Sequence, residues 1–183
     1  GLIRSLPGHA RGRPGPVGPG MGGFVPYWGA ANAPDLVGGA LVVDAGPALG
    51  DTDRETAKAL RNAWAQAGDD ELLAQVRAAY SSMVTDPKAF EPIIALVAKS
   101  DRQSIGDAIY ELVRTDISDR VKDISAPLLL VLADGGYQSM YKSQAQPGPH
   151  HEIVLSPKTK HFVMIDDPKG FYAAIDKFLA DHP

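Results

Sequence analysis

The C-terminal part of the chain alternates between short apolar runs and amphipathic segments. Residues 128–133 (LLLVLA) are apolar without interruption, and residues 151–155 (HEIVL) form a second short run. Runs of this length predict strands buried on both faces, as in a parallel sheet. We expect a helix around residues 137–145 and a last helix that Asp167 caps, with Pro168 at its first position. The inward positions of this last helix are Phe171, Ile175, Phe178 and Leu179.

The N-terminal part begins with a segment rich in glycine and proline. Residues 7–23 contain seven glycines and four prolines, a mixture that neither a helix interior nor a central strand tolerates. We therefore predict either a loop or a turn region with one tight, functional bend. From Met21 onward, apolar residues recur at helical spacing until the NAPD segment at 32–35. The run GGALVVDAGP at 38–47 then predicts a short buried strand that ends at Asp44.

Residues 51–116 carry four amphipathic stripes in succession and no strand pattern. Thr52 and Glu55 have the spacing of a capping box at the start of the first helix. Ser100 or Asp101 can cap the fourth helix. Because this block separates two predicted strands, we expect it to form a helical unit inserted into another domain.

The order of these elements predicts the fold class. Strands that alternate with helices indicate an α/β protein with a parallel sheet covered on both faces. We expect residues 1–50 and 117–183 to form this α/β core, with residues 51–116 inserted.

Composition excludes several classes of function. The chain is 44% hydrophobic and 22% charged, with a net charge of −4 and no basic block, as in a soluble protein without a nucleic-acid partner. No apolar run is long enough to span a bilayer, and no signal-peptide pattern opens the chain, so we expect no membrane association and a cytoplasmic location. The absence of cysteine excludes disulfides and thiolate chemistry. No histidine pair has helical ligand spacing, so we expect no metal and no other cofactor.

Three residues follow predicted strands at the edge of the sheet where α/β proteins bind ligands. Asp44 and Asp134 each end a buried strand, and a carboxylate in such a place costs several kcal/mol unless it is paired or hydrated. His161 lies between the strand at 151–155 and the last helix. The alternatives are a turn or cap aspartate in each case and a histidine satisfied in the core.

The bend itself has the glycine spacing of a nucleophile elbow, G-x-S-x-G, in which a serine lies on a sharp turn between a strand and a helix. Here Gly18, Gly20 and Gly22 provide the spacing, and Gly20 occupies the place of the serine. A glycine-rich loop with no function is the alternative interpretation.

Taken together, these segments resemble the α/β-hydrolase family. VGPGMGG (17–23) is similar to the family's elbow, and ISAPLLLVLADGGY (124–137) to its penultimate strand. HFVMIDDPKGFYAAIDKFLA (161–180) closely resembles the catalytic-histidine loop and the last helix. The resemblance covers roughly residues 17–183 and implies a partial α/β-hydrolase-like sheet with a helical cap that shapes the substrate pocket.

The resemblance also assigns roles to residues. It implies that His161 is the catalytic base, that Asp44 is the acid that orients it, and that Gly20 lies at the nucleophile position. Asp134 is the alternative acid, because some branches carry the acid after the later strand. We prefer Asp44, since the usual acid of those branches lies slightly past Asp134, where this chain has a glycine. The backbone N–H of Met21 is implied as one oxyanion donor.

The implied function is hydrolysis of ester-like acyl bonds in a small apolar substrate. A glycine cannot attack a carbonyl, and loss of the nucleophile typically costs about 10⁶ in kcat. Residual catalysis would need water activated by His161, or the oxyanion hole alone. The alternatives are a non-catalytic member that binds a small molecule or a protein, and a half-domain without activity. Because family members carry further strands ahead of the bend, we also expect an open sheet edge covered in a homo-oligomer or by a companion chain.

Overall fold

The computed structural model describes residues 15–145 and 150–182. The chain forms two compact units. The first contains residues up to Pro47 together with those from Ile117 onward, and the second is Ala48–Asp116. Among the described residues, no helix combines the length and the apolar character needed to cross a bilayer.

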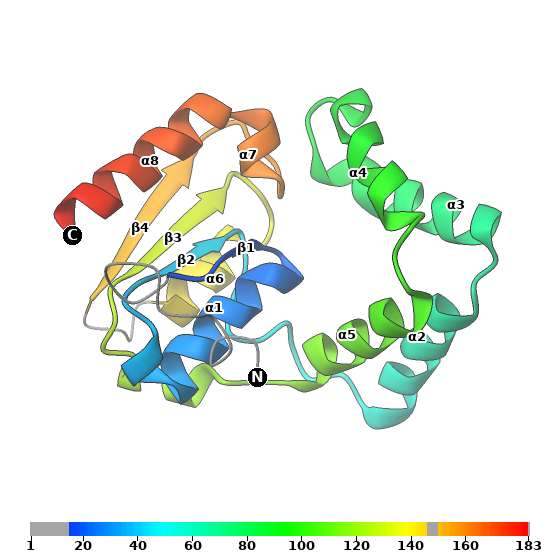
Figure 1. Cartoon of the computed structure of the whole chain (residues 1–183), viewed down its shortest axis with the longest axis horizontal. Helices are drawn as coiled ribbons and strands as arrows, with labels where there is room; N and C mark the ends of the chain where they lie inside the picture. The colour runs from blue at the N-terminus through cyan, green and yellow to red at the C-terminus, as the bar shows by residue number, and fades with distance from the viewer. Residues whose placement is uncertain (1–14, 146–149, 183) are drawn as a thin grey trace. The chain divides into compact units, whose positions relative to one another are not determined.

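The first unit is built on a four-stranded parallel sheet with the strand order β1-β2-β3-β4 (Figure 1). Its strands are β1 (Val17–Pro19), β2 (Ala40–Val43), β3 (Leu128–Ala133) and β4 (His151–Ser156). The three strands predicted from apolar runs are confirmed. The short strand β1 was not predicted, because it lies inside the segment whose glycines and prolines indicated a loop; residues 7–14 of that segment lie outside the described residues. β1 is an edge strand of this sheet, and its covering by a second copy or a companion chain stays a prediction.

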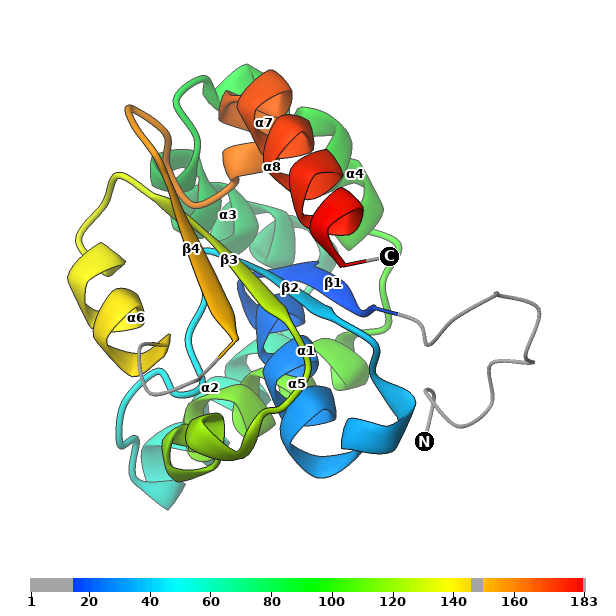
Figure 2. The same cartoon turned by 90° about the vertical axis from the view of Figure 1, so that its left-hand side faces the viewer.

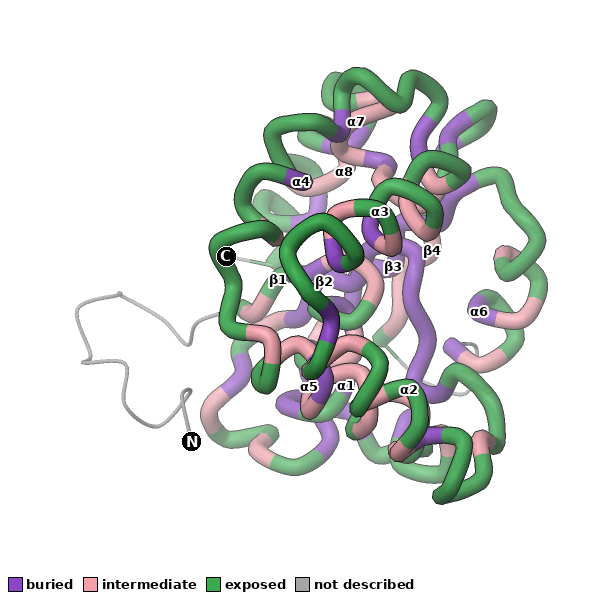
Figure 3. The backbone as a smooth tube through the Cα atoms, turned by 90° about the vertical axis from the view of Figure 1, so that its right-hand side faces the viewer, coloured by how far each residue is buried: buried purple, intermediate pink, exposed green. Residues whose placement is uncertain are grey.

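Helices cover both faces of the sheet (Figure 2). On one face lie α1 (Met21–Asn32) and α6 (Gln138–Ala145), and on the other lie α7 (Val163–Asp166) and α8 (Pro168–Asp181). Because side chains alternate along a strand, β3 contributes Leu128, Leu130 and Leu132 to the first core and Leu129, Val131 and Ala133 to the second. Every residue of β3 is buried, as Figure 3 shows by colour.

The last helix begins as the sequence predicted. The side chain of Asp167 accepts a hydrogen bond from the Gly170 backbone N–H at 2.9 Å, and Pro168 is the first helical residue. Phe171 and Phe178 pack against the sheet, but the prediction that Leu179 points inward was wrong, since its exposed fraction is 59%. The α7 turn just before this helix was also not predicted.

The second unit contains helices, joined by short connecting segments, and no strand within its described residues. Its α-helices are α2 (Arg54–Gln66), α3 (Asp69–Tyr80), α4 (Glu91–Val97) and α5 (Arg102–Arg114). Its 3₁₀ turns are η3 (Ser81–Met83) and η4 (Pro87–Phe90), and the described residues of the first unit contain η2 (Pro34–Leu36) and η5 (Ser118–Asp123). Helices α2 and α5 pack along each other. The buried residues of α3 are Leu72 and Val76.

The capping of this helical unit differs from the prediction at one end. The predicted capping box of Thr52 and Glu55 was wrong by one residue, because Asp53 is the N-cap of α2 and its carboxylate accepts from the backbone N–H groups of Glu55 and Thr56. Asp101 caps α5 as expected, accepting from the Ser104 N–H at 2.8 Å. A role of this unit as a cap over the substrate stays a prediction.

Candidate active site

The turn from β1 into α1 is a sharp bend at Gly20. Gly20 has φ +51° and ψ −122°, in the region of backbone space that favours glycine, and α1 begins at the next residue. Its N–H donates to the Val43 carbonyl at 3.1 Å, and its carbonyl accepts from the Gly23 N–H at 2.9 Å. The bend is thereby held at the C-terminal edge of the sheet.

The other glycines of the bend allow the strand end and the helix start to lie against each other. A Cβ at Gly18 would lie 2.3 Å from the Gly22 carbonyl oxygen, and one at Gly23 would lie 2.7 Å from the Ala45 Cβ. At Gly22 a Cβ would meet only the Pro19 ring, at an ordinary 3.6 Å. The glycine spacing in the sequence therefore reflects close approach of the backbone at specific positions.

This crowding predicts opposite outcomes for two neighbouring substitutions. We expect Gly18→Ala to lower the free energy of unfolding by about 3 kcal/mol, because the backbone of α1 must move away from the new methyl group. We expect Gly22→Ala to be neutral or to stabilise by up to about 1 kcal/mol, since alanine is the better helix former. Urea denaturation of both variants measures the difference. Equal stability of the two variants would contradict the packing described for the bend.

A histidine and an aspartate meet beside the bend, although 117 positions separate them in the sequence. His161 Nδ1 lies 2.8 Å from Asp44 Oδ2. Asp44 follows β2 directly and is buried, with a left-handed φ of +44°. Its second oxygen, Oδ1, accepts from the Ala133 backbone N–H at 3.0 Å. Both carboxylate oxygens are therefore used, one to fix the strand end and one to hold the imidazole.

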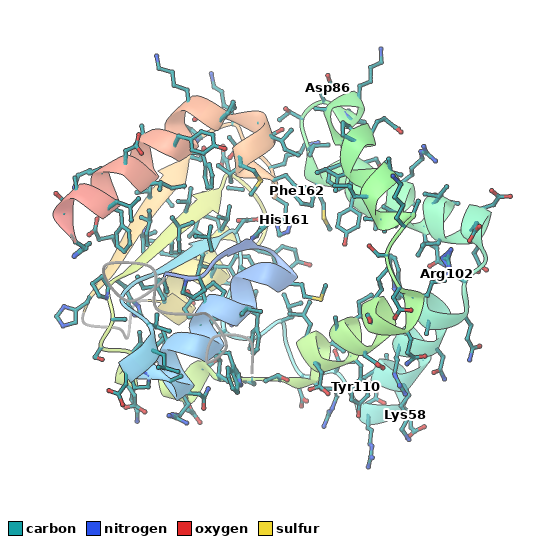
Figure 4. All side chains as sticks on the ribbon, in the orientation of Figure 1. Lys58, Asp86, Arg102, Tyr110, His161 and Phe162 are labelled. Carbon is teal, nitrogen blue, oxygen red and sulfur yellow. The ribbon has the colours of Figure 1, made fainter. Side chains whose placement is uncertain are left out.

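The other ring nitrogen of His161 faces the bend. A Cβ placed on Gly20 would lie 2.6 Å from His161 Nε2 and 3.2 Å from Cε1. The ring of Phe162 lies edge-on to the imidazole at 5.0 Å (Figure 4). In the tautomer that carries its proton on Nδ1 and donates it to Asp44, the lone pair of Nε2 is directed to the bend. The structure thus brings together Gly20, Asp44 and His161, the three positions singled out in the sequence.

The alternative acid, Asp134, has different partners. Its Oδ2 accepts from the Lys158 backbone N–H at 3.3 Å, and its own N–H donates to the Thr159 carbonyl at 3.2 Å. Asp134 therefore ties the turn after β4 to the end of β3. The carboxylate that contacts the imidazole is that of Asp44, not Asp134.

Met21 is the first residue of α1, and the first amides of a helix have no acceptor within it. The aligned peptide dipoles also give this end a partial positive charge. The Met21 N–H is therefore available to an anionic oxygen that forms next to the bend. Among the described residues, no group of three or more histidine, aspartate and glutamate side chains is placed to hold a metal.

Sequence reasoning missed Tyr141 of α6. Its ring is buried, stacks on Tyr137 with centroids 5.8 Å apart, and would lie 2.7 Å from a Cβ at Gly46, two residues after Asp44. Burial and then the negative charge of Asp44 raise the pKa of the Tyr141 hydroxyl to about 12. The sequence shows two tyrosines four residues apart, but nothing in it indicates that Tyr141 lies close to the Asp44 carboxylate.

The raised pKa of Tyr141 predicts loss of stability at alkaline pH. The unfolded chain releases this proton near pH 10, whereas the folded chain keeps it until its pKa of about 12, so the stabilisation is present below pH 10 and falls between these values. We expect a loss on the order of 2 kcal/mol from this group. Burial also raises the pKa of Tyr27 and Tyr80, so the wild-type chain loses more. Urea denaturation from pH 9 to pH 12 should show a shallower decline for Tyr141→Phe; an identical decline would contradict the prediction.

Comparisons with known proteins agree with this geometry at the level of the fold. No protein-family model matches the sequence, and no curated protein matches it. Among solved structures, an esterase from Thermogutta terrifontis is similar with a TM-score of 0.79 and 20% identity over 94% of this chain. MenH from S. aureus is similar with a TM-score of 0.81 and 17% identity over 99% of this chain. An enol-lactonase from Burkholderia xenovorans LB400 is similar with a TM-score of 0.74 and 16% identity over 92% of this chain.

The protein has part of the α/β-hydrolase fold. The chain spans 66% of the length of the esterase and the lactonase and 73% of the length of MenH. In the α/β-hydrolase fold the nucleophile lies on the sharp turn from a strand into a helix, and the acid and the histidine follow it in the chain. Gly20 lies on a turn of this kind, and Asp44 and His161 follow it in this order along the chain.

Proposed function

We propose that the protein hydrolyses ester-like acyl bonds of small molecules at His161 and Asp44. The observation that carries the proposal is the orientation of the imidazole. Its Nδ1 lies 2.8 Å from Asp44, while its Nε2 faces Gly20 on the turn between β1 and α1. A histidine held by a buried carboxylate, with its free nitrogen at a strand–helix turn, is the arrangement that prepares attack on an acyl carbon.

The chemistry needs a nucleophile, which Gly20 does not provide. The lone pair of His161 Nε2 can generate one from water or can attack the acyl carbon itself. In both routes the carbonyl oxygen becomes negative beside the bend, where the Met21 N–H can stabilise it. Sites that have lost part of a catalytic triad keep about 10³ to 10⁴ of rate enhancement over water. We therefore propose slow hydrolysis of reactive acyl compounds.

Two further points support the choice of acyl chemistry and of a small substrate. Similar structures include an esterase and an enol-lactonase, both of which act on acyl–oxygen bonds, although identities of 16 to 20% carry the fold alone. The helical unit Ala48–Asp116 is inserted between β2 and β3, where the resemblance implies a cap. We propose that this unit shapes the part of the site that receives an apolar acyl group.

A second candidate function is binding without turnover. Gly20 favours it, because the bend offers no hydroxyl to form a covalent intermediate. Saturable binding of an acyl compound with no release of its leaving group would support this second function.

The proposal is tested by comparing two histidines that each contact a carboxylate. We expect His161→Ala to lower kcat/KM for p-nitrophenyl acetate by about 10²-fold or more, because it removes the lone pair at the bend. His182 lies at the end of α8, where its Nε2 is 2.8 Å from Glu152 Oε1. We expect His182→Ala to leave the rate unchanged, since this pair lies on the surface, away from the bend. Equal rates for His161→Ala and the wild type would overturn the proposed function.

A further inference from the structure

We propose that Asp166 is a positioning residue, which holds the imidazole of His161 in place through the backbone of the loop between β4 and α7. This inference rests on the proposed function, in which Nδ1 must stay on Asp44 while Nε2 faces the bend at Gly20. It adds to the site a residue that the resemblance to a known family did not assign.

One peptide group of this loop is held at both of its ends. It joins Thr159 to Lys160, the residue directly before His161. Its carbonyl oxygen accepts from the Asp134 backbone N–H at 3.2 Å, and its N–H donates to Asp166 Oδ2 at 2.7 Å. Because a peptide group is planar and rigid, these two hydrogen bonds fix its orientation. One bond comes from the end of β3 and the other from α7, so the loop is tied on two sides.

Few backbone rotations separate this peptide group from the imidazole. Between it and the Cα of His161 lie only the two backbone dihedrals of Lys160. On the other side of His161, the Phe162 carbonyl accepts from the N–H groups of Ile165 and Asp166 at 2.8 and 3.1 Å. His161 therefore lies between two anchored peptide groups. Asp166 contributes to both anchors, with its carboxylate to the first and its backbone N–H to the second.

The neighbouring aspartate has a different role. The side chain of Asp167 accepts from the Gly170 N–H at 2.9 Å and begins α8, whereas that of Asp166 reaches back to the loop. Two adjacent carboxylates each accept from a backbone N–H, one in a helix and one in the loop that carries the histidine. Asp167 is therefore a matched control for a loss of stability without a loss of positioning.

The size of the expected effect follows from how precisely a reacting group must be placed. Catalytic groups must be held within about 0.5 Å of the productive geometry, and a misplacement of about 1 Å can lower a rate by about 10²-fold. Loss of the Asp166 carboxylate leaves the bond from Asp134 to the same peptide group in place. We therefore expect a smaller effect, of about 10-fold.

The test compares three variants of the full chain with p-nitrophenyl acetate. We expect Asp166→Ala to lower kcat by about 10-fold and to leave KM unchanged, because the loop holds the reacting ring and not the substrate. Asp166→Asn keeps a side-chain oxygen that can accept from the Lys160 N–H, so its kcat should stay close to that of the wild type. Asp167→Ala removes a helix cap, so its urea midpoint should fall while kcat stays unchanged.

A second measurement does not depend on turnover. Proton NMR of the wild type should show the His161 Nδ1 proton, donated to Asp44, as a signal protected from exchange with water. We expect this proton to exchange faster in Asp166→Ala, because the ring leaves the carboxylate more often. Its exchange should be unchanged in Asp166→Asn and Asp167→Ala.

Several results would overturn the inference. One is an unchanged exchange rate in Asp166→Ala, or an unchanged kcat in that variant where turnover depends on His161. Another is a kcat for Asp166→Asn as low as for Asp166→Ala, and a third is the absence of a protected Nδ1 proton in the wild type. The proposed function fails separately, if His161→Ala hydrolyses the ester at the wild-type rate. In that case the exchange of the Nδ1 proton still shows whether Asp166 holds the ring.

Discussion

Gly20→Ser is expected to accelerate ester hydrolysis by about 10²-fold or more in kcat, because it restores the nucleophile whose loss costs a triad about 10⁶. The new hydroxyl would extend from a Cβ that points at His161 Nε2. Asp44 already orients the imidazole, and the Met21 N–H follows position 20 directly. In the proposed function these residues act as the base, the acid and one oxyanion donor, so the hydroxyl is the part that the substitution adds.

Gly20→Ser is also expected to lower the stability of the fold, and Gly20→Ala is the control variant that measures this effect. A side chain at φ +51° costs about 1–3 kcal/mol of stability. The imidazole must also retreat, because a Cβ at 2.6 Å from Nε2 is too close. The side chain of His161 is 22% exposed, so the ring is not enclosed on every side. Gly20→Ala has the same strain and the same displaced ring but no hydroxyl.

Comparison of the serine and alanine variants at position 20 isolates the effect of the oxygen. We expect the alanine variant to be slower than the wild type and the serine variant to be faster than both, measured as kcat for p-nitrophenyl acetate. In the serine variant mass spectrometry after acid quenching should find the acyl group on the introduced hydroxyl. A serine variant no faster than the alanine variant would show that the bend is not positioned for nucleophilic attack.

The sequence indicated which residues would lie together at the sheet edge better than it indicated strand β1, which leads into the bend. Asp44 and His161 could be found because each follows a strand, and parallel strands bring their carboxyl ends to one edge of the sheet. The choice between Asp44 and Asp134 could not be made from strand ends alone. It depends on which carboxylate reaches the imidazole, which is a matter of tertiary structure.

The elements and contacts that the sequence did not predict also depend on tertiary structure. Strand β1 has only three residues, Val17–Pro19, and one of its neighbours in the sequence is a bend, so propensity indicated a loop. It forms because β2 lies beside it and pairs with it in parallel. The cap of α2 was misplaced by one residue because Asp53 and Thr52 both have capping side chains, and only the path of the backbone decides between them. Leu179 lies outside the buried stripe of α8, whose members Phe171 and Phe178 are seven residues apart.

Asp44→Asn is expected to reduce hydrolysis that depends on His161 by about 10²-fold or more, as the same change in a serine triad costs about 10⁴. The carboxylate accepts the Nδ1 proton of the imidazole at 2.8 Å, whereas an amide can present N–H to that nitrogen instead. The ring proton would then move to Nε2. The lone pair at the bend would be lost, both for activating water and for direct attack.

Asparagine is the substitution that tests this with the least damage to the fold. Position 44 has φ +44°, which asparagine tolerates better than most residues, and its side-chain oxygen can still accept from the Ala133 N–H. Asp44→Ala would leave that buried N–H unpaired at a cost of about 1–3 kcal/mol, so it mixes stability with chemistry. We expect Asp44→Asn to unfold near the wild-type urea concentration while kcat/KM falls, and ¹⁵N NMR of the imidazole to show the proton on Nε2. If activity and tautomer are both unchanged in this variant, Asp44 anchors β2 to β3 without orienting His161, and the proposed hydrolytic site loses its acid.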